Sequence, residues 1–183
     1  ARMVADTIRA IRLENPGTSI EVLISDLNGR DADIRTVVEA QPDILNHNVE
    51  TVPRLQRPVR RRARWDRSVH VLTHGRAVAS EIGFEGMVTK TGIMLGLGET
   101  WVEIVEAMQL LREGDVDVLT IGQYLRPSQK HLPLLKYYTP AEFMSLRRIG
   151  LEMGFKHVQS GPLVPSNYHA AEQVPGRETA AAV

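Results

Sequence analysis

One stretch decides the fold predicted for this chain: Thr89-Lys90-Thr91-Gly92-Ile93-Met94-Leu95-Gly96-Leu97-Gly98-Glu99-Thr100. Its apolar run ends in a glycine-spaced turn, and Thr100 with Glu103 forms a capping box that opens a helix. The pattern predicts a buried strand that leads through a turn to a helix N-terminus. Such junctions bind anionic or polar ligands in α/β proteins, because free N–H groups meet the positive end of the helix dipole there. Glycine-rich turns also occur merely to fit tight backbone geometry, so both interpretations stay open at this point.

Strands and helices alternate on both sides of this stretch. Short apolar strands are expected at residues 20–24, 43–46 and 116–121, with a further one at 157–160. Helices are expected at residues 2–15, 31–40, 65–82, 100–114 and 139–154. This alternation is typical of a parallel sheet with right-handed crossovers. A complete eightfold barrel needs about 250 residues, so a chain of 183 residues holds either part of a barrel or a small open sheet.

The composition excludes several classes of function. The net charge is +0, so no global field would recruit nucleic acid or a membrane surface. The chain contains no cysteine, which rules out disulfides, a thiol nucleophile and an all-cysteine metal or cluster site within it. No run of about 18 apolar residues is present, and residues 1–5 read as neither a secretory signal nor a transit peptide. The chain opens without Met in what reads as the middle of a helix, so it is expected to be a fragment.

Several stretches, in order along nearly the whole chain, are similar to one known family. They are Thr7–Arg12, Asn46–Leu55, Thr89–Thr100, Asp117–Ser128 and Ser160–Val164. On these residues the chain resembles the lipoyl synthase family of radical S-adenosylmethionine (SAM) enzymes. The resemblance implies an α/β fold, a partial parallel (β/α) barrel of the radical SAM type, of which this chain would hold about the C-terminal four strands with their helices. It also implies a division into residues 1–163, the partial barrel, and 164–183, a tail with a motif of the auxiliary-cluster type.

The resemblance further implies a radical chemistry. The intact family enzymes hold two [4Fe–4S] clusters on two cysteine triplets, which lie upstream of the part that this chain matches. One cluster cleaves SAM to a 5′-deoxyadenosyl radical, which abstracts hydrogens at C6 and C8 of a protein-bound octanoyl group, and the auxiliary cluster donates the sulfur. Because neither triplet is present here, this chain by itself is expected to be inactive. A cytoplasmic location is expected, or a mitochondrial or plastid one in a eukaryote.

By the same resemblance, three strand ends are expected to contact SAM. The residues are Asn46, Asn48 and Glu50; Gly96, Gly98 and Glu99; and Gln123, Tyr124 and Leu125. The first three alternate, so on an extended segment they share one face and could bond ribose hydroxyls or the methionine ammonium group, with capping of the following loop as the alternative. The glycines would let the backbone approach the adenosyl group, and a plain strand–helix turn is the alternative. Tyr124 could instead pack at the rim, and His47 is expected to point away, with no role as a metal ligand.

Arginines crowd the segment from Arg54 to Arg67, opposed only by Asp66. Apart from Trp65 no aromatic residue interleaves with them, which disfavours nucleic-acid binding. Lipoyl carrier domains are generally acidic, so the resemblance implies that an octanoylated carrier domain docks here, while a solvated surface position is the alternative for most individual arginines. Two other functions stay open. One is a nucleotide- or phosphate-binding α/β domain that uses residues 96–100, and the other is a non-catalytic module that binds an acidic carrier domain.

The main departure from the family lies at Ser166 and Asn167. The family pattern here is Arg-Ser-Ser-Tyr-x-Ala, and its second serine is expected to ligate the auxiliary cluster. This chain has Pro165 in place of the arginine and Asn167 in place of that serine. A neutral amide is a weaker ligand than a serine alkoxide, although Ser166 could take the role after a one-residue shift. Sulfur insertion is therefore in question for this version of the motif.

Overall fold

The computed structural model describes residues 1–164, which form a five-stranded sheet and its connecting helices. The strands are β1 (Glu21–Leu23), β2 (Ile44–Asn46), β3 (Val88–Leu95), β4 (Val118–Gln123) and β5 (His157–Gly161). The α-helices are α1 (Arg2–Glu14), α2 (Asp31–Val38), α3 (Gln56–Val59), α4 (Trp65–Glu81), α5 (Trp101–Glu113) and α6 (Pro140–Glu152). The predicted alternation of strands and helices is confirmed, and the strand considered at 157–160 is present as β5.

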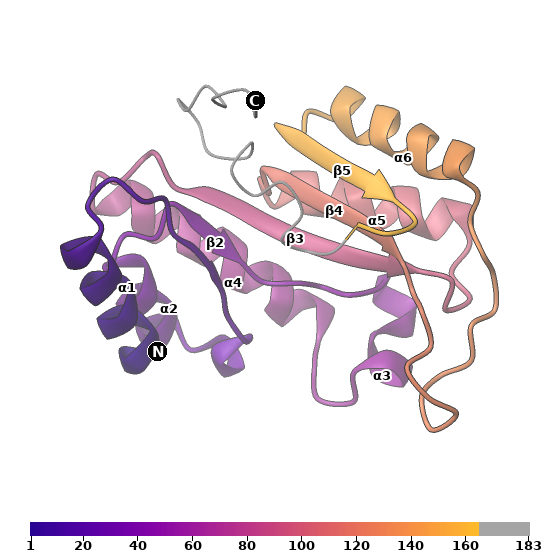
Figure 1. Cartoon of the computed structure of the whole chain (residues 1–183), viewed down its shortest axis with the longest axis horizontal. Helices are drawn as coiled ribbons and strands as arrows, with labels where there is room; N and C mark the ends of the chain where they lie inside the picture. Colours follow the sequence, from indigo (N-terminus) through magenta and orange to yellow (C-terminus); the bar gives the residue numbers. More distant parts are fainter. Residues whose placement is uncertain (165–183) are drawn as a thin grey trace.

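The strands follow one another across the sheet in the order β1-β2-β3-β4-β5, and each pair of neighbours is parallel (Figure 1). A doubly wound sheet would reverse its strand order at a switch point, whereas a barrel adds each new strand on the same side of the last one. The order therefore confirms the partial barrel and disfavours a small open sheet of the doubly wound kind. The sheet has five strands where about four were expected.

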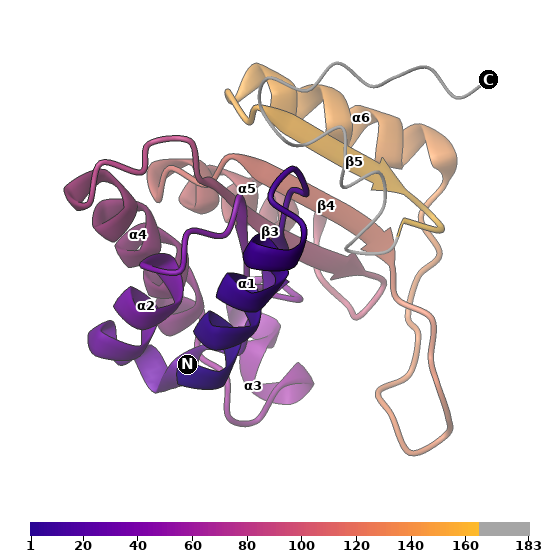
Figure 2. The ribbon, with the colours of Figure 1, turned by 60° about the vertical axis from the view of Figure 1, so that its left-hand side comes forward.

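The long helices cover one face of the sheet. Helices α4 and α5 lie behind β3 and β4 in Figure 1, and Figure 2 shows α6 along β5. Side chains of α4, α5 and α6 share a core with the strand residues Ile93, Ile121 and Val158. A second core, which contains Ala5 and Ile8 of α1, lies at the β1 edge. Because side chains alternate along a strand, the opposite face presents a different set of residues, and the functional site is built there.

The capping box predicted at Thr100 is present, and a second one opens α6. The hydroxyl of Thr100 accepts a hydrogen bond from the amide of Glu103 at 3.3 Å, and the carboxylate of Glu103 accepts one from the Thr100 amide at 2.8 Å. Thr139 and Glu142 repeat the arrangement at the start of α6. Each box satisfies two amides that a helix N-terminus leaves free, which fixes where α5 and α6 begin.

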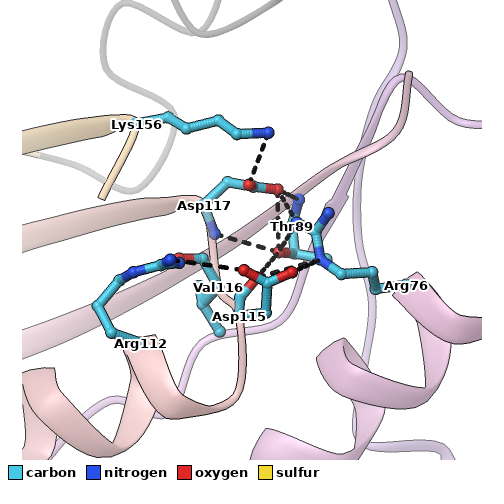
Figure 3. A network of polar contacts seen from close by, with 7 residues as sticks. All are labelled: Arg76, Thr89, Arg112, Asp115, Val116, Asp117 and Lys156. Atoms are coloured by element: carbon cyan, nitrogen blue, oxygen red, sulfur yellow. Dashed lines mark hydrogen bonds and ion pairs between the residues drawn. The ribbon is translucent and has the colours of Figure 1, made fainter. Parts of the chain in front are cut away.

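A buried carboxylate joins the amino ends of the last three strands (Figure 3). Asp117, just before β4, accepts hydrogen bonds from the Thr89 amide at 2.9 Å and from Lys156 at 2.9 Å. The guanidinium of Arg76 from α4 also binds it. The network lies at the end of the barrel where conserved contacts serve stability, opposite the end that carries active sites in this class of fold.

The arginine-rich segment is more ordered in its backbone than the sequence indicated. It forms the short helix α3 and is preceded by the turn η2 (Pro53–Leu55), whereas no helix was predicted between residues 40 and 65. Another such turn, η1 (Leu27–Gly29), follows β1. Among the helices of residues 1–164, none is long and apolar enough to cross a membrane.

Candidate functional site

A cavity of about 220 Å³ opens on the face of the sheet opposite the long helices, near the carboxyl ends of β3 and β4. Its lining consists of Asn48, Glu50, Gly92, Ile93, Met94, Thr120, Gly122, Gln123 and Val164. Binding sites in barrels of this class lie at this end of the strands. Three of the residues predicted to contact SAM, Asn48, Glu50 and Gln123, therefore meet at one place, which the sequence pattern anticipated.

Two glycines keep this cavity open. A Cβ added to Gly92 would come 2.7 Å from the Thr120 hydroxyl and 3.0 Å from Oδ1 of Asn48. One added to Gly122 would come 2.7 Å from the carbonyl oxygen of Val164. The cavity therefore exists because these two strand positions carry no side chain, and Gly92 and Gly122 were missing from the predicted contacts.

Asn48 and Glu50 give the cavity its polarity. Oδ1 of Asn48 is buried and has no hydrogen-bond partner within residues 1–164. Burial raises the pKa of the Glu50 carboxyl, while nearby Arg60 and a hydrogen bond with Asn48 oppose this rise. Glu50 also has a φ of 68°, an unusual backbone conformation for a residue with a side chain. Unsatisfied buried oxygens and a strained backbone both concentrate at binding sites, so the pair is poised to accept hydrogen bonds from a ligand.

The backbone that carries these side chains is held by groups that the sequence analysis missed. The Thr91 hydroxyl donates to the carbonyl of His47 at 2.9 Å and accepts from the amide of Val49 at 3.1 Å. The buried amide of Gln56 donates to the Val49 carbonyl at 2.6 Å, and Arg60 donates to the carbonyl of Asn48 at 2.9 Å. These contacts add to the backbone hydrogen bonds that still join the segment to β3, from the Glu50 amide to the Gly92 carbonyl and from the Met94 amide to the Glu50 carbonyl, so side chains and backbone together position the site.

Asn46 lies on the same face but not in the lining of the cavity. Its amide donates to Glu21 at 2.6 Å, and the other oxygen of Glu21 binds the ammonium of Lys90 at 3.0 Å. Lys90 is fully buried, and this burial lowers its pKa in spite of the bond to Glu21. The shared face was expected if the strand continued; β2 ends at Asn46, yet Asn48 and Glu50 still line one cavity. Asn46 is engaged within the protein through its amide, and its Oδ1 is buried with no hydrogen-bond partner within residues 1–164.

The glycine-spaced turn after β3 is satisfied by its own residues. The carboxylate of Glu99 accepts hydrogen bonds from the amides of Gly96 at 2.6 Å and Leu97 at 2.9 Å. Gly96 and Gly98 have φ values of 113° and 104°, and a Cβ on either would meet residues of the segment 134–136. None of Gly96, Gly98 and Glu99 lines the cavity, so the tight-turn interpretation accounts for all three, and a role for them in SAM binding stays a prediction.

The same turn is a poor phosphate site. Its amides at Gly96 and Leu97 are occupied by Glu99, and the amide of Thr100 is occupied by Glu103. A hydrogen bond from Arg54 lowers the pKa of Glu103 to about 2, so this carboxylate is charged at neutral pH. Two carboxylates at a helix N-terminus take the place that a phosphate would need, which disfavours the nucleotide-binding alternative.

The residues predicted after β4 divide between the cavity and the following loop. Gln123 lines the cavity, while its amide donates to the carbonyls of Leu95 at 2.8 Å and Lys136 at 3.1 Å. Tyr124 is buried, and its hydroxyl donates to the carbonyl of Leu132 at 3.0 Å, which supports packing at the rim. The side chain of Leu125 is exposed. Contacts of Tyr124 and Leu125 with SAM stay predictions.

His47 points away from the cavity, as expected. Its ring binds the carbonyl of Ile24 at 2.9 Å and the hydroxyl of Ser68 at 3.0 Å. Burial lowers the pKa of His47, so the ring is neutral at pH 7. Both nitrogens are used in packing α4 against β2, which leaves none for a metal.

The arginines between Arg54 and Arg67 fall into two groups. Four are bound within the protein. Arg54 pairs with Glu103, Arg64 with Asp66 and Arg67 with Asp26, while Arg60 donates to the carbonyl of Asn48. The guanidinium groups of Arg57, Arg61 and Arg62 are exposed and make no hydrogen bond or ion pair within the described part of the chain.

Ser166 and Asn167, predicted as cluster ligands, lie outside the described residues.

Comparisons with known proteins agree with this geometry. The model of the Radical SAM superfamily matches residues 2–111. The chain is 53% identical over 174 residues to lipoyl synthases of Bacillus mycoides (strain KBAB4) and Bacillus cereus (strain AH820), an alignment that covers 95% of this chain and 57% of each relative. Methylornithine synthase (PylB) has a similar fold, with a TM-score of 0.63 at 18% identity over 85% of this chain and 44% of that chain. The chain thus spans just over half the length of the curated relatives it matches.

Proposed function

The chain belongs to the radical SAM superfamily, and we propose that it forms the part of a lipoyl synthase that binds SAM and the carrier domain. In this proposal the whole protein inserts two sulfur atoms, at C6 and C8 of a protein-bound octanoyl group. The observation that carries it is the polar cavity at Asn48, Glu50 and Gly92, placed at the carboxyl ends of the strands in a chain that is 53% identical to lipoyl synthases. We also propose a cytoplasmic location, because the relatives that the chain matches are bacterial lipoyl synthases.

The residues present fit the polar part of SAM. The unpartnered Oδ1 of Asn48 and the Glu50 carboxylate would accept hydrogen bonds from the ammonium group or the ribose hydroxyls. Met94 and Ile93 supply apolar lining. A cavity of about 220 Å³ is smaller than the roughly 300–1,000 Å³ of usual small-molecule sites. The cavity would therefore hold part of the molecule, and SAM when bound would supply the 5′-deoxyadenosyl radical.

The [4Fe–4S] clusters of the family do not fit the residues of this chain, because it contains no cysteine. This chain's own contribution is to orient SAM, to keep its polar groups bonded at Asn48 and Glu50, and to exclude water with the strand residues around Gly92.

The proposed function is tested by comparing two proteins. The protein translated from the complete gene, supplied with iron, sulfide, reductant, SAM and an octanoylated carrier domain, should release 5′-deoxyadenosine and form lipoyl groups. The 183-residue chain under the same conditions should release none, since it has no cysteine to bind iron–sulfur clusters. Mass spectrometry of the carrier domain and chromatography of the nucleoside measure the two products. Turnover by the 183-residue chain, or none by the complete gene product, would contradict the proposal.

A carrier domain is proposed to dock at Arg57, Arg61 and Arg62. Arg61 and Arg62 lie between two surface hollows of about 770 Å³ and 570 Å³, and Arg57 lines the second. These free charges face solvent beside Arg60, whose guanidinium reaches the segment that carries Asn48, so the docking surface adjoins the cavity. Acidic partners are steered to such patches and released by salt.

Changing Arg57, Arg61 and Arg62 together to Glu is expected to weaken binding of an acidic lipoyl carrier domain by roughly tenfold or more at low salt. Calorimetry at two ionic strengths measures the affinity, and the wild-type value should fall as salt rises. The matched control changes Arg2, Arg9 and Arg147 to Glu, which alters the net charge equally on other surfaces. Equal losses in both triple variants would show a general charge effect and reject this docking surface.

A further inference from the structure

Two histidines and one aspartate meet on the outer surface of the helical layer, away from the cavity. His70 and His74 lie four residues apart on α4, which places their side chains on one face of that helix. Their rings stack with centroids 5.3 Å apart and an interplanar angle of 17°. Asp31, the first residue of α2, lies against both rings.

The distances suit a tetrahedral metal ion. Nε2 of His70 lies 2.7 Å from Oδ1 of Asp31, and Nε2 of His74 lies 3.9 Å from the same oxygen. One ligand atom from each residue lies within 4.8 Å of the other two. Zinc bonds of about 2.0–2.2 Å would separate such ligands by about 3.4 Å. A small rotation of each side chain would thus bring all of them to a common ion.

His74 gives a second reason to place a ligand here. Its Nε2 atom is buried and has no hydrogen-bond partner within residues 1–164. An unmet buried nitrogen costs free energy, and a metal bond would satisfy it.

From this juxtaposition we propose that Asp31, His70 and His74 form a binding site for a divalent transition-metal ion of the zinc type. Two imidazoles and a carboxylate are the donor set of zinc rather than of magnesium or calcium. The side chains of Asp31 and His70 are 63% and 42% exposed, so water completes the coordination. The ion would link α2 to α4, two helices that cross over between neighbouring strands, and the site is separate from the iron–sulfur chemistry proposed for the whole protein.

The test uses the full 183-residue chain, purified without a histidine tag and stripped of metal with a chelator. Calorimetric titration with Zn²⁺ should show one site per chain, and bound Zn²⁺ should raise the melting temperature. Loss of a residue that only supports a metal ligand typically weakens metal affinity by about 10- to 100-fold. His74→Ala and Asp31→Asn remove ligands themselves, so each should weaken zinc affinity by at least as much. His131→Ala is the matched control, because this histidine lies in the loop before α6 and should leave zinc binding unchanged.

Circular dichroism without metal establishes that each variant is folded. If His74→Ala is unfolded, Asp31→Asn decides the outcome, since its exposed side chain packs in no core. Wild-type affinity no higher than that of these variants, or equal loss in His131→Ala, would overturn the site.

Discussion

Replacing Asp117 by alanine is expected to lower the free energy of unfolding by about 3 kcal/mol, a large fraction of the stability of a domain. The side chain of Asp117 is 2% exposed and binds Arg76, Lys156 and the amide of Thr89 (Figure 3). Its removal leaves the Thr89 amide without its acceptor. Arg76 keeps an ion pair with Asp115 at 3.3 Å and a hydrogen bond to the Thr89 hydroxyl at 2.9 Å. The alternative partner keeps the expected loss at the lower end of the range for broken buried ion pairs.

The loss is measured by urea denaturation of the full chain. Asp117→Asn keeps an oxygen for the Thr89 amide but removes the charge, so it should cost about half as much. The control is Glu106→Ala, an exposed position on α5 outside the network, and surface changes of this kind are usually within about 0.5 kcal/mol. A cost for Asp117→Ala that does not exceed the cost for Glu106→Ala would show that the network contributes nothing.

The same carboxylate makes stability depend on pH. Burial by itself would raise the pKa of Asp117, but the Thr89 amide, Lys156 and Arg76 outweigh it, so the pKa lies below its ordinary value of 3.8. A carboxyl group whose pKa is lower in the folded state than in the unfolded state stabilises the fold. This stabilisation is fully present above the unfolded-state pKa and is lost as the pH falls through the folded-state pKa. Wild type should therefore lose this part of its stability only below about pH 4. The difference between wild type and Asp117→Asn should shrink over the same range.

The order of elements could be predicted from the sequence because each rests on local signals. Periodic apolar residues set the helices, and the capping boxes at Thr100 and Thr139 set two of their starts. The short helix α3 escaped prediction because it contains Pro58 and is held by tertiary contacts, such as the hydrogen bond from the Gln56 amide to the Val49 carbonyl. A four-residue helix has no periodicity to detect.

The candidate site could be predicted only in part, for a similar reason. Alternation along the chain led us to expect Asn48 and Glu50 on one face, and both line the cavity although β2 ends at Asn46 and Glu50 has a φ of 68°. Whether a given polar atom meets a ligand or a neighbour depends on residues far away in sequence, which the pattern does not show. Asn46 donates a hydrogen bond to Glu21, and Gln123 donates one to the loop before α6. The amides of the glycine turn donate to Glu99. The empty space at Gly92 depends in turn on Thr120, which belongs to another strand.

That space supports the second large prediction. In the protein translated from the complete gene, Gly92→Ala is expected to weaken SAM binding and 5′-deoxyadenosine release by about 100-fold, since a displacement of about 1 Å in a site can have that effect. The new methyl group would lie 2.7 Å from the Thr120 hydroxyl and 3.0 Å from Asn48, within the cavity. Equilibrium dialysis with labelled SAM measures the affinity. The control is Gly86→Ala, because a Cβ at that exposed position meets nothing within 4 Å.

A double variant separates filled space from a disturbed fold. Thr120→Ala removes the hydroxyl that the new methyl group would meet, so the Gly92→Ala/Thr120→Ala protein should regain the stability lost by Gly92→Ala alone. SAM binding should stay weak in the double variant, because the methyl group still occupies the cavity beside Asn48. Recovery of both stability and SAM binding would mean that Gly92→Ala weakened SAM binding by displacing the strand, and not by filling the cavity. Normal SAM binding in Gly92→Ala itself would place SAM elsewhere and reject the cavity as its site.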